Sequence, residues 1–149
     1  MKSQAITILA VLTLIFAWTA APAYAQSPVR LTAKIPFGFV VGKQAFPAGV
    51  YTLRPHSGGG FPTWTAFVIQ SVDHKYSHIV LTQAGRARRM PDSSELVFKR
   101  YGESYFLSQV LLTGVETGRQ LPIARRMLEL AKVPADAKAE EVAVIAAAQ

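Results

Sequence analysis

Short apolar segments, each about the length of one β-strand and each ended by Gly, Pro or Asp, follow one another from Val29 onward. In the first of them every second residue is apolar, and Arg30, Thr32 and Lys34 stand between, as is typical of a half-buried strand. The segments recur about every ten residues. This spacing predicts an all-β fold, an antiparallel sandwich or small barrel of about seven or eight strands with one C-terminal amphipathic helix. It argues against the strand–helix alternation of doubly wound nucleotide-binding folds.

Seven segments carry the strand pattern, and two turns are expected near the start of the chain. The segments are Val29–Ile35, Phe37–Val41, Val50–Arg54, Thr63–Val72, Tyr76–Thr82, Glu95–Tyr101 and Ser104–Leu112. Gly42-Lys43 can form a tight turn. Pro47-Ala48-Gly49 suits a three-residue hairpin loop, with Gly49 in the left-handed conformation.

The pair Gly102-Glu103 links the last two of these segments. A Gly at the first central position favours a type II′ hairpin turn. That turn fixes the register, so Arg100 is expected opposite Tyr105 and Phe98 opposite Leu107.

Beyond Gly118 the pattern changes to a helical period. Ala124, Met127, Leu128 and Ala131 recur at helical spacing after Pro122, and we expect a short amphipathic helix whose apolar stripe packs on the β-core. Residues 26–132 should therefore form one β-domain that ends in this helix. Residues 133–149 are Ala-rich with only a weak apolar stripe, which predicts a frayed helix or a disordered tail.

The first 25 residues have the pattern of a secretory signal peptide. Lys2 precedes an apolar run from Ala5 to Trp18, and Ala23-Tyr24-Ala25 matches a cleavage site, which predicts a mature chain that starts at Gln26. The alternative is an N-terminal membrane anchor, but the run is shorter than the ~20 residues that span a bilayer. We expect an exported protein, periplasmic or extracellular, with no transmembrane segment after cleavage.

The charge balance is basic and the chain has no Cys. Sixteen Lys and Arg against nine Asp and Glu give a net charge of +7, and removal of Lys2 with the signal peptide lowers it to +6. Without Cys, a disulfide scaffold, a thiolate metal site, a cysteine nucleophile and a lipidated N-terminal Cys are all excluded.

The densest cluster of charge is Arg86, Arg88 and Arg89, which with Lys75 and Lys99 could belong to an anion-binding face. Guanidinium groups suit bidentate contacts with phosphate or carboxylate. Export argues against nucleic acid, so the expected partners are an anionic envelope polysaccharide, lipopolysaccharide, the membrane surface or an envelope protein. The alternative is a solubilising loop beside an edge strand.

Several segments in this order resemble a family of small exported bacterial proteins that is common in acidobacterial genomes. They are Ile35–Gly42, Phe46–Thr52, Leu96–Ser108 and Gly118–Pro122. The resemblance extends over roughly Val29 to Lys132, and the cluster at Arg86–Arg89 is outside its pattern. It implies export and a β-rich fold, and it assigns no activity, cofactor or catalytic residue.

The motifs of metal and phosphate sites are weak. His74 and His78 are four residues apart across a turn and a strand, where they are best interpreted as exposed histidines. The glycines Gly58–Gly60 follow His56, but a phosphate loop requires a helix after them and the sequence predicts a strand. We expect no metal and no cofactor.

No catalytic motif is present either. The carboxylates Glu95, Glu103 and Glu116 are scattered and fall at strand ends, where solvated side chains are common. The leading hypothesis is a non-catalytic extracytoplasmic β-domain that binds an envelope component or partner protein. The alternative is a carrier of a small apolar ligand with a lipocalin-like interior, and the third is a hydrolase with an unrecognised site.

Overall fold

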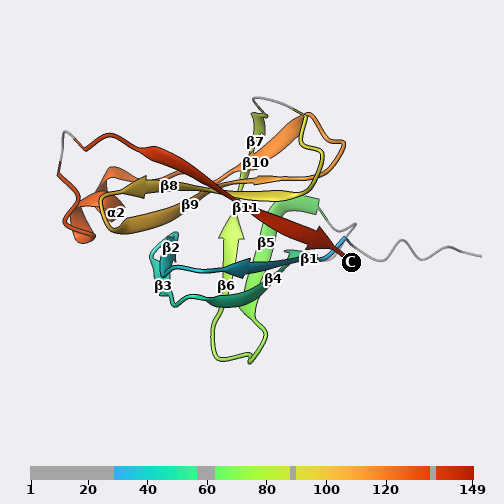
Figure 1. Cartoon of the computed structure of the whole chain (residues 1–149), viewed down its shortest axis with the longest axis horizontal. Helices are drawn as coiled ribbons and strands as arrows, with labels where there is room; N and C mark the ends of the chain where they lie inside the picture. The colour runs from blue at the N-terminus through green and yellow to red at the C-terminus, as the bar shows by residue number, and fades with distance from the viewer. Residues whose placement is uncertain (1–28, 57–62, 88–89, 135–136) are drawn as a thin grey trace, which may run out of the picture.

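A computed structural model describes residues 29–56, 63–87, 90–134 and 137–149 (Figure 1). The predicted signal peptide at 1–25, the three glycines Gly58–Gly60, and Arg88 and Arg89 lie outside these ranges. The described part is all-β with one short helix, as the sequence predicts. Its elements are β1 (Leu31–Ile35), β2 (Phe39–Val41), β3 (Gln44–Phe46), β4 (Gly49–His56), β5 (Thr63–Ser71), β6 (Ser77–Leu81), β7 (Gln83–Arg86), β8 (Glu95–Tyr101), β9 (Ser104–Leu111), β10 (Thr117–Gln120), α2 (Arg125–Leu130) and β11 (Glu140–Ala148).

The strands form a nearly closed barrel, in the order β3-β2-β9-β8-β11-β1-β4-β5-β6. β11 pairs with β8 through its first six residues and with β1 through Ala146–Ala148, so it joins the two layers (Figure 1). On the other side the chain passes from β6 to β7 through Thr82, and β7 pairs with β10, which pairs with β9. The Thr82 amide N–H donates to the Thr65 carbonyl at 2.8 Å, and its hydroxyl donates to the Trp64 carbonyl. The two layers are therefore joined at two places, by β11 on one side and by the passage from β6 to β7 on the other.

Aromatic and aliphatic side chains fill the interior of the barrel. The ring of Phe39 lies 5.1 Å from that of Tyr51 and 5.5 Å from that of Phe98, and Phe46 lies 5.7 Å from Tyr51. Edge-to-face contacts of this kind add about 0.5–1.5 kcal/mol each to the burial of the rings. The strand alternation supplies the rest of the core, which includes Leu31, Ile35, Leu53, Phe67, Ile69, Leu96, Leu107 and Val110.

The β8–β9 hairpin confirms the predicted boundaries and register. Arg100 pairs with Tyr105 and Phe98 with Leu107. Gly102 has a φ of 59°, and Glu103 has no positive φ, as a type II′ turn requires. A β-bulge between Val97 and Phe98 adds one residue to β9, where the Ser108 hydroxyl donates to the Val97 carbonyl at 2.9 Å.

The predicted hairpin loop at Pro47-Ala48-Gly49 is wrong. The tight turn at Gly42-Lys43 does form, with a φ of 59° at Gly42, and it pairs β3 with β2. β4 pairs instead with β1 and β5, and Gly49 lies opposite Ile35 without a positive φ. Because β3 already has its partner, Pro47 and Ala48 carry the chain from one layer to the other.

The predicted frayed or disordered tail at 133–149 is also wrong, because Glu140–Ala148 is a strand in the middle of the sheet. Val142 and Val144 pack against the core and Ala146 is part of it, so the apolar stripe has period two. Pairing on both sides with β1 and β8 overrides the helix propensity of the Ala residues. The count of seven or eight strands is accordingly too low: the described residues form eleven.

The predicted helix is present but short, as α2 covers six residues within the expected range. Its apolar side chains Met127 and Leu128 are only half-buried. Within the described residues, no helix has the length and apolar character that crossing a membrane would require.

Candidate functional site

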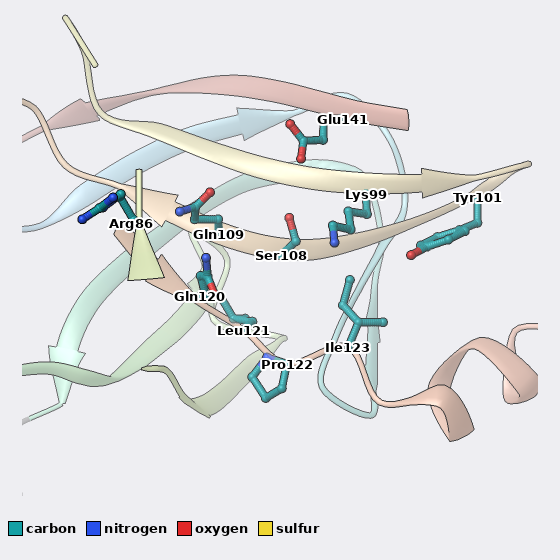
Figure 2. Close-up of a pocket in the computed structure, with 10 residues that line it drawn as sticks. All are labelled: Arg86, Lys99, Tyr101, Ser108, Gln109, Gln120, Leu121, Pro122, Ile123 and Glu141. Carbon is teal, nitrogen blue, oxygen red and sulfur yellow. The ribbon is translucent and has the colours of Figure 1, made fainter. Parts of the chain in front are cut away.

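A polar hollow of about 420 Å³ lies on the outer face of the sheet, over β8, β9 and β10 (Figure 2). It is lined by side chains from five strands and from the segment after β10. They are Arg86, Lys99, Tyr101, Ser108, Gln109, Gln120, Leu121, Pro122, Ile123 and Glu141. Most of these side chains can donate or accept hydrogen bonds, which distinguishes the hollow from the apolar interior.

Strand alternation on β8 places the first two functional groups. Leu96 and Phe98 point into the core, so Lys99 and Tyr101 lie on the opposite, outer side of the strand. The ring of Tyr101 lies 5.9 Å from that of Phe106, edge to face, and this contact fixes its orientation.

Two glutamines form the middle of the hollow. Gln109 and Gln120 lie opposite each other on β9 and β10. Their amides pass over Gly118 and Gly85, which are themselves paired between β10 and β7. A Cβ at either glycine would meet these amides, so the glycines make room for the two side chains. Within the described residues, the Nε2 atom of Gln109 is buried and makes no hydrogen bond.

Two cations, Arg86 and Lys99, line the hollow on either side of the glutamines. Figure 2 shows Arg86 at one end and Tyr101 at the other, with Gln109 and Gln120 between them. Arg86 is exposed on β7, which is three strands from β8, about 14 Å across the sheet at ordinary strand spacing. It is also several residues from Lys99 along the strand direction. Glu141 lies directly opposite Lys99 across the β8–β11 pair. The hollow thus presents two separated cations, one carboxylate beside a cation, and neutral amides in the middle.

The sequence analysis identified part of this site. Arg86 was expected in a loop but lies at the end of β7, opposite Thr117. Lys99 does join it in the hollow, whereas Lys75 lies elsewhere, in a turn, 3.5 Å from the Asp73 carboxylate. Tyr101, Gln109, Gln120 and Glu141 were not predicted from the sequence. The alternation along 99–101 could have indicated Tyr101, but nothing in the sequence brings Glu141 to Lys99.

A second hollow, also about 420 Å³, is mainly apolar and surrounds Tyr51 and Tyr76. The Tyr51 hydroxyl donates to the Pro47 carbonyl at 2.7 Å, and burial raises the pKa of Tyr51, with smaller contributions from Tyr76 and Asp73. The Ser71 hydroxyl donates to the Asp73 carboxylate at 2.6 Å, and this bond lowers the pKa of Asp73. These polar contacts are internal, and they stabilise the loop and turn at this end of the barrel.

The histidines and scattered carboxylates do not converge. His74 lies in the turn with a φ of 60°, and His78 lies on β6. No group of three or more His, Cys, Asp or Glu side chains suitable for a metal ion occurs in the described ranges. Glu95 is only 8% exposed, whereas the sequence predicted a solvated side chain. Glu103 lies just beyond the far end of β8, roughly 25 Å from Glu95, and this distance is too long for the carboxylate pair of a glycosidase.

Comparisons with known proteins do not add to this picture. The chain matches no family model, and no curated protein and no solved structure is significantly similar to it. The resemblance to the acidobacterial family stays a prediction, and the function has to be inferred from the geometry of the polar hollow.

Proposed function

We propose that the protein is an exported, non-catalytic β-domain that binds an anionic glycan of the cell envelope along the polar hollow. One observation carries the proposal: two cations, Arg86 and Lys99, lie on either side of neutral amides in an elongated hollow. Periplasmic or extracellular location rests on the signal peptide pattern of residues 1–25.

The two cations supply the attraction. Arg86 is exposed and Lys99 half-buried, so both can contact a ligand that approaches from solvent. A charge-assisted hydrogen bond contributes about 1.5–3 kcal/mol. The net charge of +6 that remains after removal of Lys2 favours approach of a polyanion at low ionic strength.

The middle of the hollow suits sugar hydroxyls. Gln109 and Gln120 each offer a donor and an acceptor, and so does a hydroxyl group. The Nε2 atom of Gln109 is buried without a partner among the described residues, and such a donor costs about 1–3 kcal/mol. A ligand oxygen that reached this amide after a rotation of the side chain would remove that cost.

The packing of the barrel favours this proposal over a carrier for a small apolar ligand. A barrel of about eight strands is just wide enough for side chains to fill. Here the rings of Phe39, Phe46, Tyr51 and Phe98 occupy the interior in mutual contact. Binding on the outer face requires no cavity inside the barrel.

The test is calorimetric titration of the purified exported protein with acidic exopolysaccharide and with lipopolysaccharide, at 0.1 M and 1 M salt. We expect binding at low salt that weakens strongly at high salt, as the Debye length falls from about 10 Å to about 3 Å. The double variant Arg86→Gln, Lys99→Gln should bind at least about tenfold more weakly.

Lys43→Gln is the matched control, because Lys43 is an exposed cation in the β2–β3 turn, outside the hollow. It should bind within about twofold of the wild type. Equal binding by the double variant and the wild type would contradict the proposal, and so would equal losses in the double variant and the control.

A further inference from the structure

Within this proposed function, we infer that the hollow selects a glycan whose charges are carboxylates spread along the chain, of the uronic-acid class, over a phosphorylated ligand. The inference rests on the spacing of the cations, the position of Glu141 and the hydrogen-bonding character of the side chains between them.

The two cations of the hollow lie far apart. Arg86 and Lys99 are three strands apart, about 14 Å across the sheet. Arg86 is also level with the end of β9, several residues from Phe106, which lies opposite Lys99, so the two positions are more than about 14 Å apart. One compact phosphate cannot contact both groups at once. A chain of carboxylated sugars carries one charge on each ring, so charges on rings several units apart can reach the two cations.

Glu141 makes the end at Lys99 selective. Its position directly opposite Lys99 places a negative charge beside the cation that the ligand would contact. A phosphate monoester carries about −1.5 to −2 charges at pH 7, whereas a carboxylate carries one. Glu141 offsets the attraction of Lys99, and the extra charge of phosphate gains little at this end. The Glu141 carboxylate can also accept hydrogen bonds from sugar hydroxyls, because its oxygens carry several lone pairs.

The remaining side chains suit a sugar ring. The amides of Gln109 and Gln120 can both donate to and accept from hydroxyl groups, whereas a phosphate dianion only accepts. Tyr101, held edge to face by Phe106, offers an aromatic surface at the end near Lys99 (Figure 2). Such a surface suits the C–H face of a sugar, because the π-face carries partial negative charge.

The experiment compares three oligosaccharides of equal length by calorimetry at 0.1 M salt and pH 7. One is an oligouronate, one is the same chain with its carboxyl groups reduced to alcohols, and one is a phosphorylated neutral chain. We expect the wild type to bind the oligouronate about tenfold more tightly than the phosphorylated chain, and the reduced chain most weakly.

Glu141→Gln is the decisive variant, because it keeps the shape of an exposed side chain and removes its charge. It should narrow the preference for the oligouronate over the phosphorylated chain to less than about threefold. Lys43→Gln should keep the wild-type preference. A purely structural role of Glu141 would change all three affinities together and leave their ratio intact.

The possible failures are distinguishable. Equal or tighter binding of the phosphorylated chain by the wild type, or an unchanged ratio in Glu141→Gln, overturns the inference and leaves the proposed function standing. Binding of neither charged chain, or oligouronate binding that survives in Arg86→Gln, Lys99→Gln, overturns the proposed function itself.

Discussion

The β8–β9 hairpin and β11 lie side by side in the same layer, yet only the hairpin is recognisable in the sequence. The hairpin is rich in aromatic and β-branched residues, and its two strands meet across a Gly-containing turn. β11 is Ala-rich, and its partners β1 and β8 are distant in sequence. Local pairing leaves a local pattern, whereas a strand whose partners are remote owes its conformation to the sheet that receives it.

The two regions also contribute differently to the barrel and to the hollow. The hairpin supplies Lys99, Tyr101 and Gln109 from one continuous segment. β11 joins the two layers and brings Glu141 opposite Lys99. Because its partners β1 and β8 precede it in the sequence by many residues, the layers are joined through β11 by long-range pairing, which forms slowly in folding.

Deletion of residues 140–149 should have the largest effect. It removes pairing partners from both β1 and β8 and exposes core residues such as Leu31 and Leu96. We expect loss of the cooperative thermal transition in circular dichroism, whereas loss of a frayed or disordered tail would change it little. An unchanged melting temperature would show that β11 is dispensable for folding and would contradict its role in joining the two layers.

A pair of substitutions tests which side chains of β11 face the core, and we expect a smaller effect than that of the deletion. Ala146 is 4% exposed and part of the core, whereas its neighbour Ala147 is exposed. Ala146→Leu should overpack the core and lower the free energy of unfolding by about 1–3 kcal/mol. Ala147→Leu should change it by less than about 0.5 kcal/mol. Chemical denaturation measures both, and equal effects would mean that the strand does not present alternate faces as described.

A smaller effect is expected in the hairpin turn. Gly102 has a φ of 59° and no atom lies within 4 Å of the position that a Cβ would take, so the cost of Gly102→Ala is one of backbone conformation alone. We expect a loss of about 1–2 kcal/mol in the free energy of unfolding. Glu103→Ala, at the neighbouring turn position without a positive φ, should be nearly neutral. If Glu103→Ala were the more damaging change, the turn would not be the type II′ turn that the register indicates.

The hairpin could be predicted from the sequence, whereas the short strands and β11 could not. Period-two alternation and the Gly-Glu turn were sufficient for β8, β9 and the pairing of Phe98 with Leu107. They were insufficient for β3, β7 and β10, which are three or four residues long and have too few alternating positions to be distinguished from loops. β11 was missed because the local preference of Ala for helix opposes the pairing that the sheet imposes.

The site was predictable only where charge alone marked it. Arg86 and Lys99 were candidates for anion binding from their charge. Gln109 and Gln120 are ordinary polar strand residues until β10 is placed beside β9. Glu141 belonged to a segment interpreted as a tail, so its position opposite Lys99 depends wholly on the fold.

The most direct test of the account is an NMR titration of the isotope-labelled protein with an oligouronate, followed through the backbone amides. We expect the largest chemical-shift changes at Lys99, Tyr101, Gln109, Gln120 and Glu141, which only the folded sheet brings together. Changes confined to the apolar hollow around Tyr51 and Tyr76, or changes in the hairpin without any in β11, would contradict it.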